Sequence, residues 1–180
     1  MDNGIRRYLI GEKKLPSVTS ILDATKSDED KAALANWIER TGLKESEAIV
    51  KAASNRGSKM HAYLESFLLG QQNLSFFDDD EKYKIMAKQI IEKGLINRFE
   101  EVWGVECTLY KPDSYSGTCD AVGVYDGCES IIDFKQSNKP KKFEYIDSWL
   151  LQTAAYSLAH NTVYKSNITA CVILVCTVDN

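Results

Sequence analysis

The dipeptide Asp126-Gly127 constrains the fold of this chain more than any other feature of its sequence. A two-residue type I′ turn needs positive φ at both central positions, and Asp-Gly is one of the residue pairs that tolerate this geometry. Segments with the composition of β-strands lie on either side of the dipeptide, at residues 117–125 and 130–135. We therefore predict an antiparallel hairpin that is closed by this turn.

The length of the loop sets the register of the hairpin. With a two-residue loop, Asp120 lies directly opposite Asp133, and their Cβ atoms are roughly 4.5–5.5 Å apart. A longer loop, residues 126–129, would instead place Asp120 opposite Lys135. Because side chains alternate with period 2 along a strand, all three residues share one face in either case.

Two carboxylates that face each other on a sheet repel, and a divalent cation between them removes this cost. Oxygen ligands of this kind suit Mg²⁺ or Mn²⁺. Lys135 would position a water molecule or, as a neutral amine, deprotonate it, and its ammonium form would stabilise charge on a phosphate. The alternative is an ordinary Asp–Lys pair on a solvated strand face, but the register that brings Asp120 opposite Asp133 favours a catalytic metal site.

The remaining pattern predicts an α/β fold with a mixed sheet flanked by helices, in one domain of residues 1–180. Residues 1–100 are expected to be mainly helical, and residues 101–180 to supply a catalytic sheet and helix. Expected helices cover residues 28–40, 45–69 and 144–161, with a short one after Ser17 or Thr19 and another that begins in the acidic run 78–81. Expected strands cover residues 102–110, 117–125, 130–135 and 168–178. Met60, Leu64, Phe67 and Leu68 recur at helical spacing and are expected to face the core.

Composition limits the possible classes of protein. Hydrophobic residues make up 44%, which is enough for a core, and no apolar run approaches the roughly 18 residues of a membrane span. The first residues lack the apolar stretch of a secretory signal, so we expect an intracellular, cytoplasmic protein. The five cysteines show no CxxC spacing and are interpreted as reduced thiols. A net charge of -4 argues against coating nucleic acid by charge alone, but not against local contacts with phosphates.

An ordered series of motifs resembles the RecB-type nucleases of the PD-(D/E)XK superfamily. In order, the motifs are Gly117-Thr118-Cys119-Asp120, Asp133-Phe134-Lys135 and Gln152-Thr153-Ala154-Ala155-Tyr156, and the upstream stretch 56–65 resembles the helical histidine motif of the same group. Residues 15–22 and 133–141 are similar to the mitochondrial genome maintenance exonucleases and their phage-encoded relatives. The resemblance covers residues 15–176. Two departures are that Cys119 replaces the proline of the family motif, and that relatives usually continue beyond the last expected strand.

The resemblance implies a restriction-endonuclease-like core and a role for each motif residue. The implied ligands of Mg²⁺ or Mn²⁺ are His61, Asp120, Asp133 and the carbonyl of Phe134. Lys135 would act on the attacking water, while Gln152 and Tyr156 would support the active site and contact DNA. Taken alone, His61 would favour a buried core histidine, and only within the motif set is a metal ligand favoured.

Several further residues are candidates for contacts with nucleic acid. Lys139 and Lys141 follow the catalytic strand. They would either contact a phosphate backbone or lie in a solvated loop. Tyr145, Trp149, Gln152 and Tyr156 share one face of an expected helix. They would either stack on bases or belong to an amphipathic core helix, whose apolar face would consist of Leu150, Leu151, Ala154, Ala155 and Leu158. Ser17 and Thr19 would cap a helix, touch DNA, or do both.

These patterns and the resemblance together favour a metal-dependent deoxyribonuclease that hydrolyses phosphodiester bonds. We expect an exonuclease on single-stranded DNA ends that acts in replication, repair or recombination, and in the host cytoplasm if a phage encodes it. The alternatives are a structure-specific endonuclease and a catalytically silent nucleic-acid-binding module on the same fold. Polarity, the number of metal ions and the oligomeric state stay open at this stage.

Overall fold

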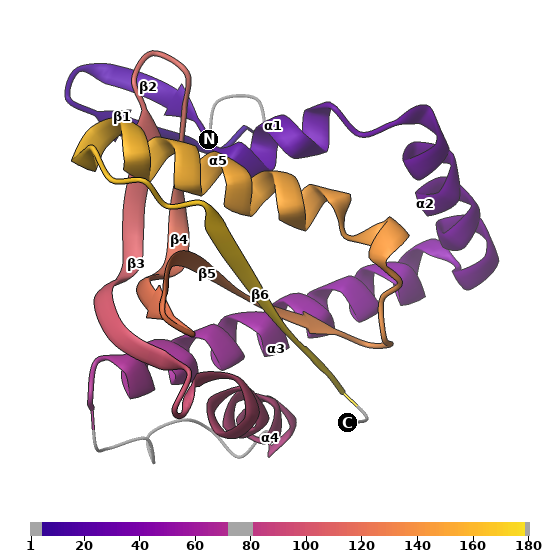
Figure 1. The fold of residues 1–180 in the computed structure, drawn as a ribbon. Coiled ribbons are helices and arrows are strands. Elements are labelled where there is room, and N and C mark those ends of the chain that lie inside the picture. Colours follow the sequence, from indigo (N-terminus) through magenta and orange to yellow (C-terminus); the bar gives the residue numbers. More distant parts are fainter. Residues whose placement is uncertain (1–4, 72–80, 179–180) are drawn as a thin grey trace.

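A computed structural model describes residues 5–71 and 81–178 and shows a mixed four-stranded sheet with helices on both faces (Figure 1). The strand order is β3 (Phe99–Lys111), β4 (Tyr115–Tyr125), β5 (Cys128–Ser137) and β6 (Ala170–Thr177). Strand β4 is antiparallel to both β3 and β5, and β6 runs parallel to β5. The helix α5 (Asp147–Tyr164) supplies the crossover between these parallel strands. The predicted fold class is confirmed.

The turn between β4 and β5 has the predicted geometry. Asp126 has φ 47° and Gly127 has φ 75°, as a type I′ turn requires. Tyr125 pairs with Cys128, and the register continues until Ala121 pairs with Ile132. The two-residue loop is therefore correct, and the longer-loop alternative is wrong.

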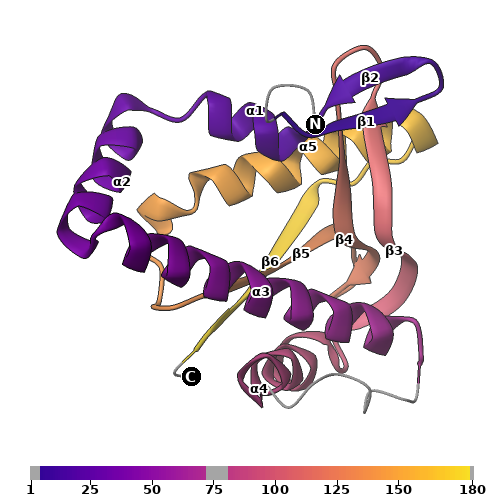
Figure 2. The same cartoon turned by 180° about the vertical axis from the view of Figure 1, so that it is seen from behind.

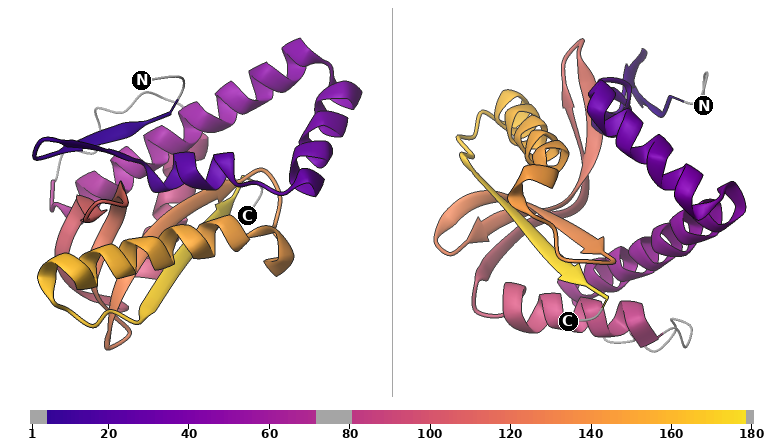
Figure 3. Two further views of the ribbon diagram at one scale, coloured as in Figure 1. Left: turned by 90° about the horizontal axis from the view of Figure 1, so that it is seen from above. Right: turned by 90° about the vertical axis from the view of Figure 1, so that its right-hand side faces the viewer.

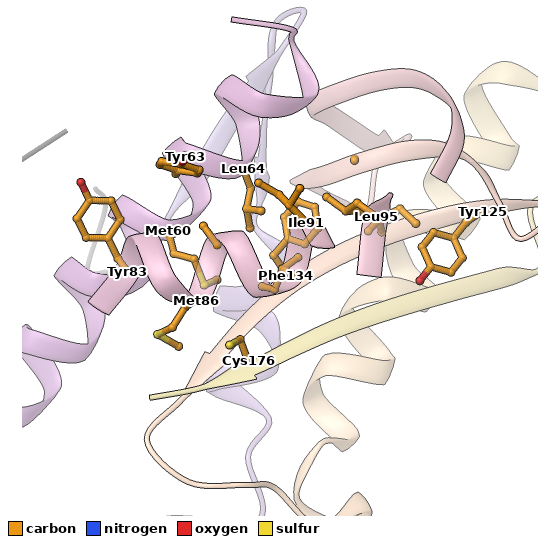
Figure 4. Close-up of a cluster of buried hydrophobic side chains, with 14 residues drawn as sticks. Met60, Tyr63, Leu64, Tyr83, Met86, Ile91, Leu95, Tyr125, Phe134 and Cys176 are labelled. Carbon is orange, nitrogen blue, oxygen red and sulfur yellow. The ribbon is translucent and has the colours of Figure 1, made fainter. Parts of the chain in front are cut away.

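Helices cover the two faces of the sheet. Figures 1 and 2 show the molecule from opposite sides, with α5 in front of the sheet in one and α3 (Leu43–Leu68) in front in the other. With α3 lie α4 (Glu81–Ile90) and the π-helical turn Ile91–Leu95. Their side chains form the main core against β4, β5 and β6 (Figure 4). Within it Met60 and Leu64 are fully buried, and Phe67 and Leu68 pack against its edge, which confirms the predicted stripe.

Two short helices connect the N-terminal region to α3 (Figure 3). The first, α1 (Val18–Ala24), packs beside α5, and its cap is Ser17, whose hydroxyl accepts the Ser20 N–H at 3.0 Å. The second, α2 (Asp28–Thr41), is capped by Ser27 and has no buried residue. Of the two predicted caps for the first helix, Ser17 is therefore correct and Thr19 is not.

Three expectations for the elements are wrong. Residues 7–16 form a hairpin, β1 (Arg7–Ile10) and β2 (Lys13–Pro16), because Gly11 turns the chain at φ 60° and Leu15 is buried. The helix expected from residue 144 begins only at Asp147, after a 3₁₀ turn at Phe143–Tyr145. Its buried face is not the leucine-rich one: Leu151 and Leu158 are exposed. Of the acidic run, residues 78–80 lie outside the described residues.

Hydroxyl groups explain why α5 buries its polar face. Thr153 donates to the carbonyl of Leu150 within the helix, and Ser157 donates to the carbonyl of Ile168 at 2.7 Å. Buried hydroxyls that are hydrogen-bonded in this way lose little on leaving water. None of the five cysteines, all of which lie within the described residues, forms a disulfide. No helix in the described part of the chain is long and apolar enough to cross a membrane.

Candidate active site

The two predicted aspartates lie where the pairing of β4 and β5 ends. The last paired residues are Ala121 and Ile132, so that Asp120 and Asp133 come next on their strands. One carboxylate oxygen of Asp120, Oδ2, accepts the backbone N–H of Phe134 at 2.6 Å. This charge-assisted hydrogen bond fixes the Asp120 side chain between the two strands.

Asp133 is a buried carboxylate with an incomplete set of partners. Its Oδ1 accepts a hydrogen bond from Gln152 Nε2 at 3.2 Å, and its Oδ2 pairs with the ammonium group of Lys135. Among the described residues, no donor makes a hydrogen bond of normal geometry to Oδ2. Burial raises the pKa of Asp133 to about 6, against the opposing charge of Lys135, and the nearby charge of Asp120 adds to the rise. The metal-free site therefore disfavours a full negative charge on this group.

His61 reaches the same place from α3. Its Nδ1 lies 3.2 Å from Asp120 Oδ1, and its ring meets Phe134 edge-on at a centroid distance of 6.2 Å. Burial lowers the pKa of His61, but the hydrogen bond and charge of Asp120 outweigh it, and the net pKa is raised. The imidazole is thus held against a carboxylate and is not an isolated core histidine.

Gln152 and Tyr156 connect α5 to the aspartates. Gln152 Nε2 lies 3.2 Å from Asp133 Oδ1 and 3.3 Å from the hydroxyl of Tyr156. The ring of Tyr156 is 3% exposed and lies so close to Gly117 that a Cβ there would sit 2.6 Å from Tyr156 Cε1. The buried ring of Tyr156 therefore leaves little surface on which a base could stack. Tyr145 precedes the helix, so the expected aromatic face of α5 does not form.

A cavity of about 390 Å³ opens beside these residues. Its walls come from the N-terminal hairpin region, α1, α3, β3, β4 and α5 and consist of Arg6, Tyr8, Ser17, Thr19, Gly57, Ser58, His61, Glu106, Gly117, Thr118, Asp120, Gln152 and Tyr156. Thr19 is exposed to this space, whereas the Ser17 hydroxyl is engaged in the cap of α1. The guanidinium of Arg6 stacks on Tyr8 at 4.9 Å and is the cation among these lining residues.

Sequence reasoning missed three residues of this cavity: Arg6, Tyr8 and Glu106. The first two belong to the unpredicted N-terminal hairpin. Glu106 lies on β3, whose register with β4 was not predicted. Glu106 Oε, Asp120 Oδ and His61 N atoms all lie within 4.8 Å of one another. Burial, with the charge of Asp120 adding to it, raises the pKa of Glu106.

The donor set suits a divalent cation. Carboxylates and one imidazole converge here, and the buried Asp133 Oδ2 is paired with the Lys135 ammonium group but accepts no hydrogen bond of normal geometry from the described residues. Oxygen-rich sites with a single nitrogen ligand fit Mn²⁺ and Mg²⁺ better than softer metals. The residues present therefore fit the metal that the motifs imply.

A second hollow of about 440 Å³ lies next to the first. Its walls include Lys139, Lys141 and Trp149, together with Ala53 of α3 and Gln136 of β5. Gln136 also joins β5 to α3, because its amide accepts two hydrogen bonds from Arg56, at 2.7 and 2.9 Å, and donates one to the carbonyl of Ala53. The predicted contact residues Lys139, Lys141 and Trp149 thus share one surface hollow.

An α/β core with a mixed sheet that holds two aspartates and a lysine at the point where two strands separate is consistent with a PD-(D/E)XK-like core. No protein-family model matches the chain. The chain is similar to the human mitochondrial genome maintenance exonuclease 1, with 29% identity over 174 residues, which cover 89% of this chain and 48% of the human protein. It is also 30% identical to the mouse protein of that name over 132 residues, which cover 71% of this chain and 38% of the mouse protein. The chain therefore spans about half, or less, of the length of these relatives.

Proposed function

We propose that this chain is a metal-dependent deoxyribonuclease that hydrolyses phosphodiester bonds, and that it acts as an exonuclease on single-stranded DNA ends. The observation that carries the proposal is the cluster of Asp120, Asp133, Lys135 and His61 at the end of the β4–β5 pairing. The similarity to two proteins named as exonucleases supports the same class of activity. A role in replication, repair or recombination belongs to this proposal.

In this proposal, the metal ligands are His61, Asp120, Asp133 and the carbonyl of Phe134. A bound Mg²⁺ or Mn²⁺ would polarise a phosphoryl oxygen and lower the pKa of a bound water. Gln152 orients Asp133 through its Oδ1 and is itself held by Tyr156. Lys135 is only slightly exposed and directs its ammonium group to Asp133, so that it can hold a proton or a water molecule beside the scissile phosphate.

The shape of the site supports a single strand as the substrate. A cavity of about 390 Å³ is the size of a site for a small ligand, so it is large enough for one nucleotide unit of a strand. Arg6 in its wall offers a positive charge to a phosphate. In the neighbouring hollow, Lys139 and Lys141 can contact the next phosphates and Trp149 can stack on a base.

Digestion of 5′- and 3′-end-labelled DNA tests the proposal. Wild-type protein is expected to shorten a single strand in Mg²⁺ or Mn²⁺ and to leave it intact in EDTA. Asp133→Asn should abolish cleavage, because it removes a metal ligand. Asp126→Asn is the matched control, since this aspartate lies in the exposed turn of the same hairpin and should leave cleavage unchanged.

The two alternatives correspond to other outcomes of the same assay. Internal cuts in a strand with blocked ends would identify an endonuclease and overturn the end requirement. Binding of DNA without cleavage in any of the metals would identify a silent binding module and overturn the catalytic proposal.

A further inference from the structure

We propose that a further hollow, on the outer side of α3, binds a backbone phosphate of the substrate DNA outside the active-site cavity. This outer hollow has a volume of about 430 Å³, and its walls are Ala52, Asn55, Arg56, Ser58 and Lys59 of α3 and Lys82 of α4. The inference rests on the nuclease function proposed above and deepens it, because it assigns a substrate contact to these residues. The ligand is the phosphodiester group of a nucleic acid.

The outer hollow lies on the side of α3 that faces away from the main core. Met60 and Leu64 of this helix are buried in the core, as expected for a helix that lies across the sheet (Figure 2). Ala52, Asn55 and Ser58 are exposed and follow one another at intervals of three residues. Ser58 also lines the active-site cavity, so the cavity and the outer hollow meet at this residue. A strand bound in the cavity can therefore reach the outer hollow across Ser58.

Neutral groups hold the guanidinium of Arg56 in place. Its Nε and Nη2 donate to the side-chain oxygen of Gln136, at 2.9 and 2.7 Å, and Nη2 also donates to the side-chain oxygen of Asn138. Both acceptors are amides, so they orient the guanidinium without neutralising its charge. The N–H groups of Nη1 make no hydrogen bond to the described residues. An arginine that has a fixed orientation and two N–H groups left over is suited to bind phosphate oxygens.

Two lysines add to the positive charge of the outer hollow. The ammonium group of Lys59 lies 5.5 Å from the centre of the Tyr83 ring, a cation–π contact that also leaves its charge in place. Lys82 is exposed in the first turn of α4. No ion pair among the described residues includes Arg56, Lys59 or Lys82, and none of the residues that line the hollow is acidic. Three cations without a counter-ion in this part of the chain favour an anionic ligand.

A backbone phosphate fits the donors of the outer hollow. Asn55 and Ser58 add neutral hydrogen-bond donors to the three cations, and arginine, lysine, asparagine and serine are all typical partners of phosphate oxygens in nucleic acids. Contacts of this kind carry no sequence information, which suits an enzyme that removes nucleotides whatever their base. Because the net charge of the chain is -4, such local clusters are also where phosphate contacts are expected.

The salt dependence of DNA binding tests the inference without reference to cleavage. Fluorescence anisotropy of a labelled single-stranded oligothymidylate is measured in EDTA over a range of KCl concentrations. Lys59→Gln and Lys82→Gln should each lower the slope of log Kd against log salt concentration by about 0.7, and the double variant by about 1.4, with an affinity loss on the order of 10-fold at about 0.1 M salt. The matched control is Lys44→Gln, an exposed lysine of α3 that does not line the hollow. It removes the same charge from the chain and should leave the slope unchanged.

The outcomes separate this inference from the proposed function. Circular dichroism with thermal melting shows that each variant is folded. Slopes of Lys59→Gln and Lys82→Gln equal to that of wild type, or an equal loss in Lys44→Gln, would overturn the phosphate site and leave the nuclease proposal standing. Failure of wild type to bind the oligothymidylate at any salt concentration would overturn both. Lower slopes in the two variants, in a protein whose wild type binds DNA but cleaves none in Mn²⁺, would support the phosphate site and overturn only the nuclease proposal.

Discussion

Asp133 combines almost complete burial with a negative charge that Lys135 and, more weakly, His61 offset. Its pKa of about 6 in the folded chain lies above the ordinary value for an aspartate, because burial disfavours the charged form. The folded state therefore holds a proton on this group more tightly than the unfolded state does. Its contribution to folding stability consequently increases as the pH falls through about 6 and is lost above that value.

This titration predicts opposite pH trends with and without metal. In EDTA, the free energy of unfolding of wild type relative to Asp133→Asn should increase by about 1 kcal/mol between pH 7.5 and pH 5.5. With Mn²⁺, which needs the deprotonated carboxylate, the rise in melting temperature caused by the metal should be larger at pH 7.5 than at pH 5.5. Thermal melting of both proteins checks the two trends, and a metal effect that is larger at the lower pH would contradict the assignment.

A substitution of Lys135 distinguishes a role in turnover from a role in metal binding. Lys135→Met keeps the length of the side chain and removes its ammonium group, so the proton or water beside the phosphate loses its partner. We expect turnover at saturating Mn²⁺ to fall by about 100-fold or more, while the number of bound ions is unchanged. Without metal the variant should melt at a lower temperature, because Asp133 keeps a buried charge with no counter-ion. Turnover within threefold of wild type would show that Lys135 has no catalytic role.

At the scale of elements, the features that could be predicted from the sequence are those set by residues close together in the chain. The Asp126-Gly127 turn fixed the register of β4 and β5, so that Asp120, Asp133 and Lys135 could be placed together from residue types and spacing alone. The loop between β3 and β4 contains Pro112-Asp113, which is compatible with several types of turn and therefore does not define a register. The pairing of these strands also shifts between Val102 and Gly104, which breaks the period-2 pattern that locates a partner across a sheet. The position of Glu106 opposite Asp120 could therefore not be predicted from the sequence.

The helices show the same limit. Apolar spacing located the buried stripe of α3, because that stripe packs into an apolar cluster with α4 and with β4, β5 and β6. It failed for α5, where Thr153 and Ser157 satisfy their hydroxyl groups on backbone carbonyls and leave Leu151 and Leu158 exposed. Hydrogen bonds of this kind depend on the tertiary position of a strand or loop, which a pattern of residue types does not contain.

Gly123 tests the close packing of β3 on β4. A Cβ at this position would sit 1.9 Å from the carbonyl oxygen of Glu101 and 2.8 Å from Phe99 Cε2, so the two strands would have to separate. We expect Gly123→Ala to lower the free energy of unfolding by about 3 kcal/mol or more. Gly127→Ala is the control: nothing lies within 4 Å, and the cost comes only from its φ of 75°, about 1–2 kcal/mol. Urea denaturation of both variants measures the difference, and equal losses would contradict the backbone clash.

At the scale of the whole molecule, the active-site cavity and the hollow lined by Lys139 and Lys141 follow one another along the space between α3 and α5. Gly57, Ser58 and His61 of α3 face the active-site cavity. Ala53, one turn before Gly57, faces the hollow lined by Lys139 and Lys141. On α5, Gln152 lines the active-site cavity, and Trp149, about one turn earlier, lines the hollow with Lys139 and Lys141. A strand that passes through the cavity would therefore continue past Lys139 and Lys141. The connection from the N-terminal hairpin through α1 and α2 to α3 borders the same region (Figure 3).

This arrangement predicts that the substrate enters by a free end. A closed single-stranded circle has no end to insert between α3 and α5, and a blunt duplex must first separate its strands. With equal nucleotide concentrations in Mn²⁺, a linear single strand should be degraded fastest, a blunt duplex at least about 10-fold more slowly, and the closed circle slowest, since each factor of 10 corresponds to only about 1.4 kcal/mol of barrier. The control is the same circle cut once, which should regain the rate of the linear strand. Release of acid-soluble nucleotides measures the three rates. Digestion of the closed circle as fast as its linear form would show that the strand is not inserted by its end, and the endonuclease alternative would then hold.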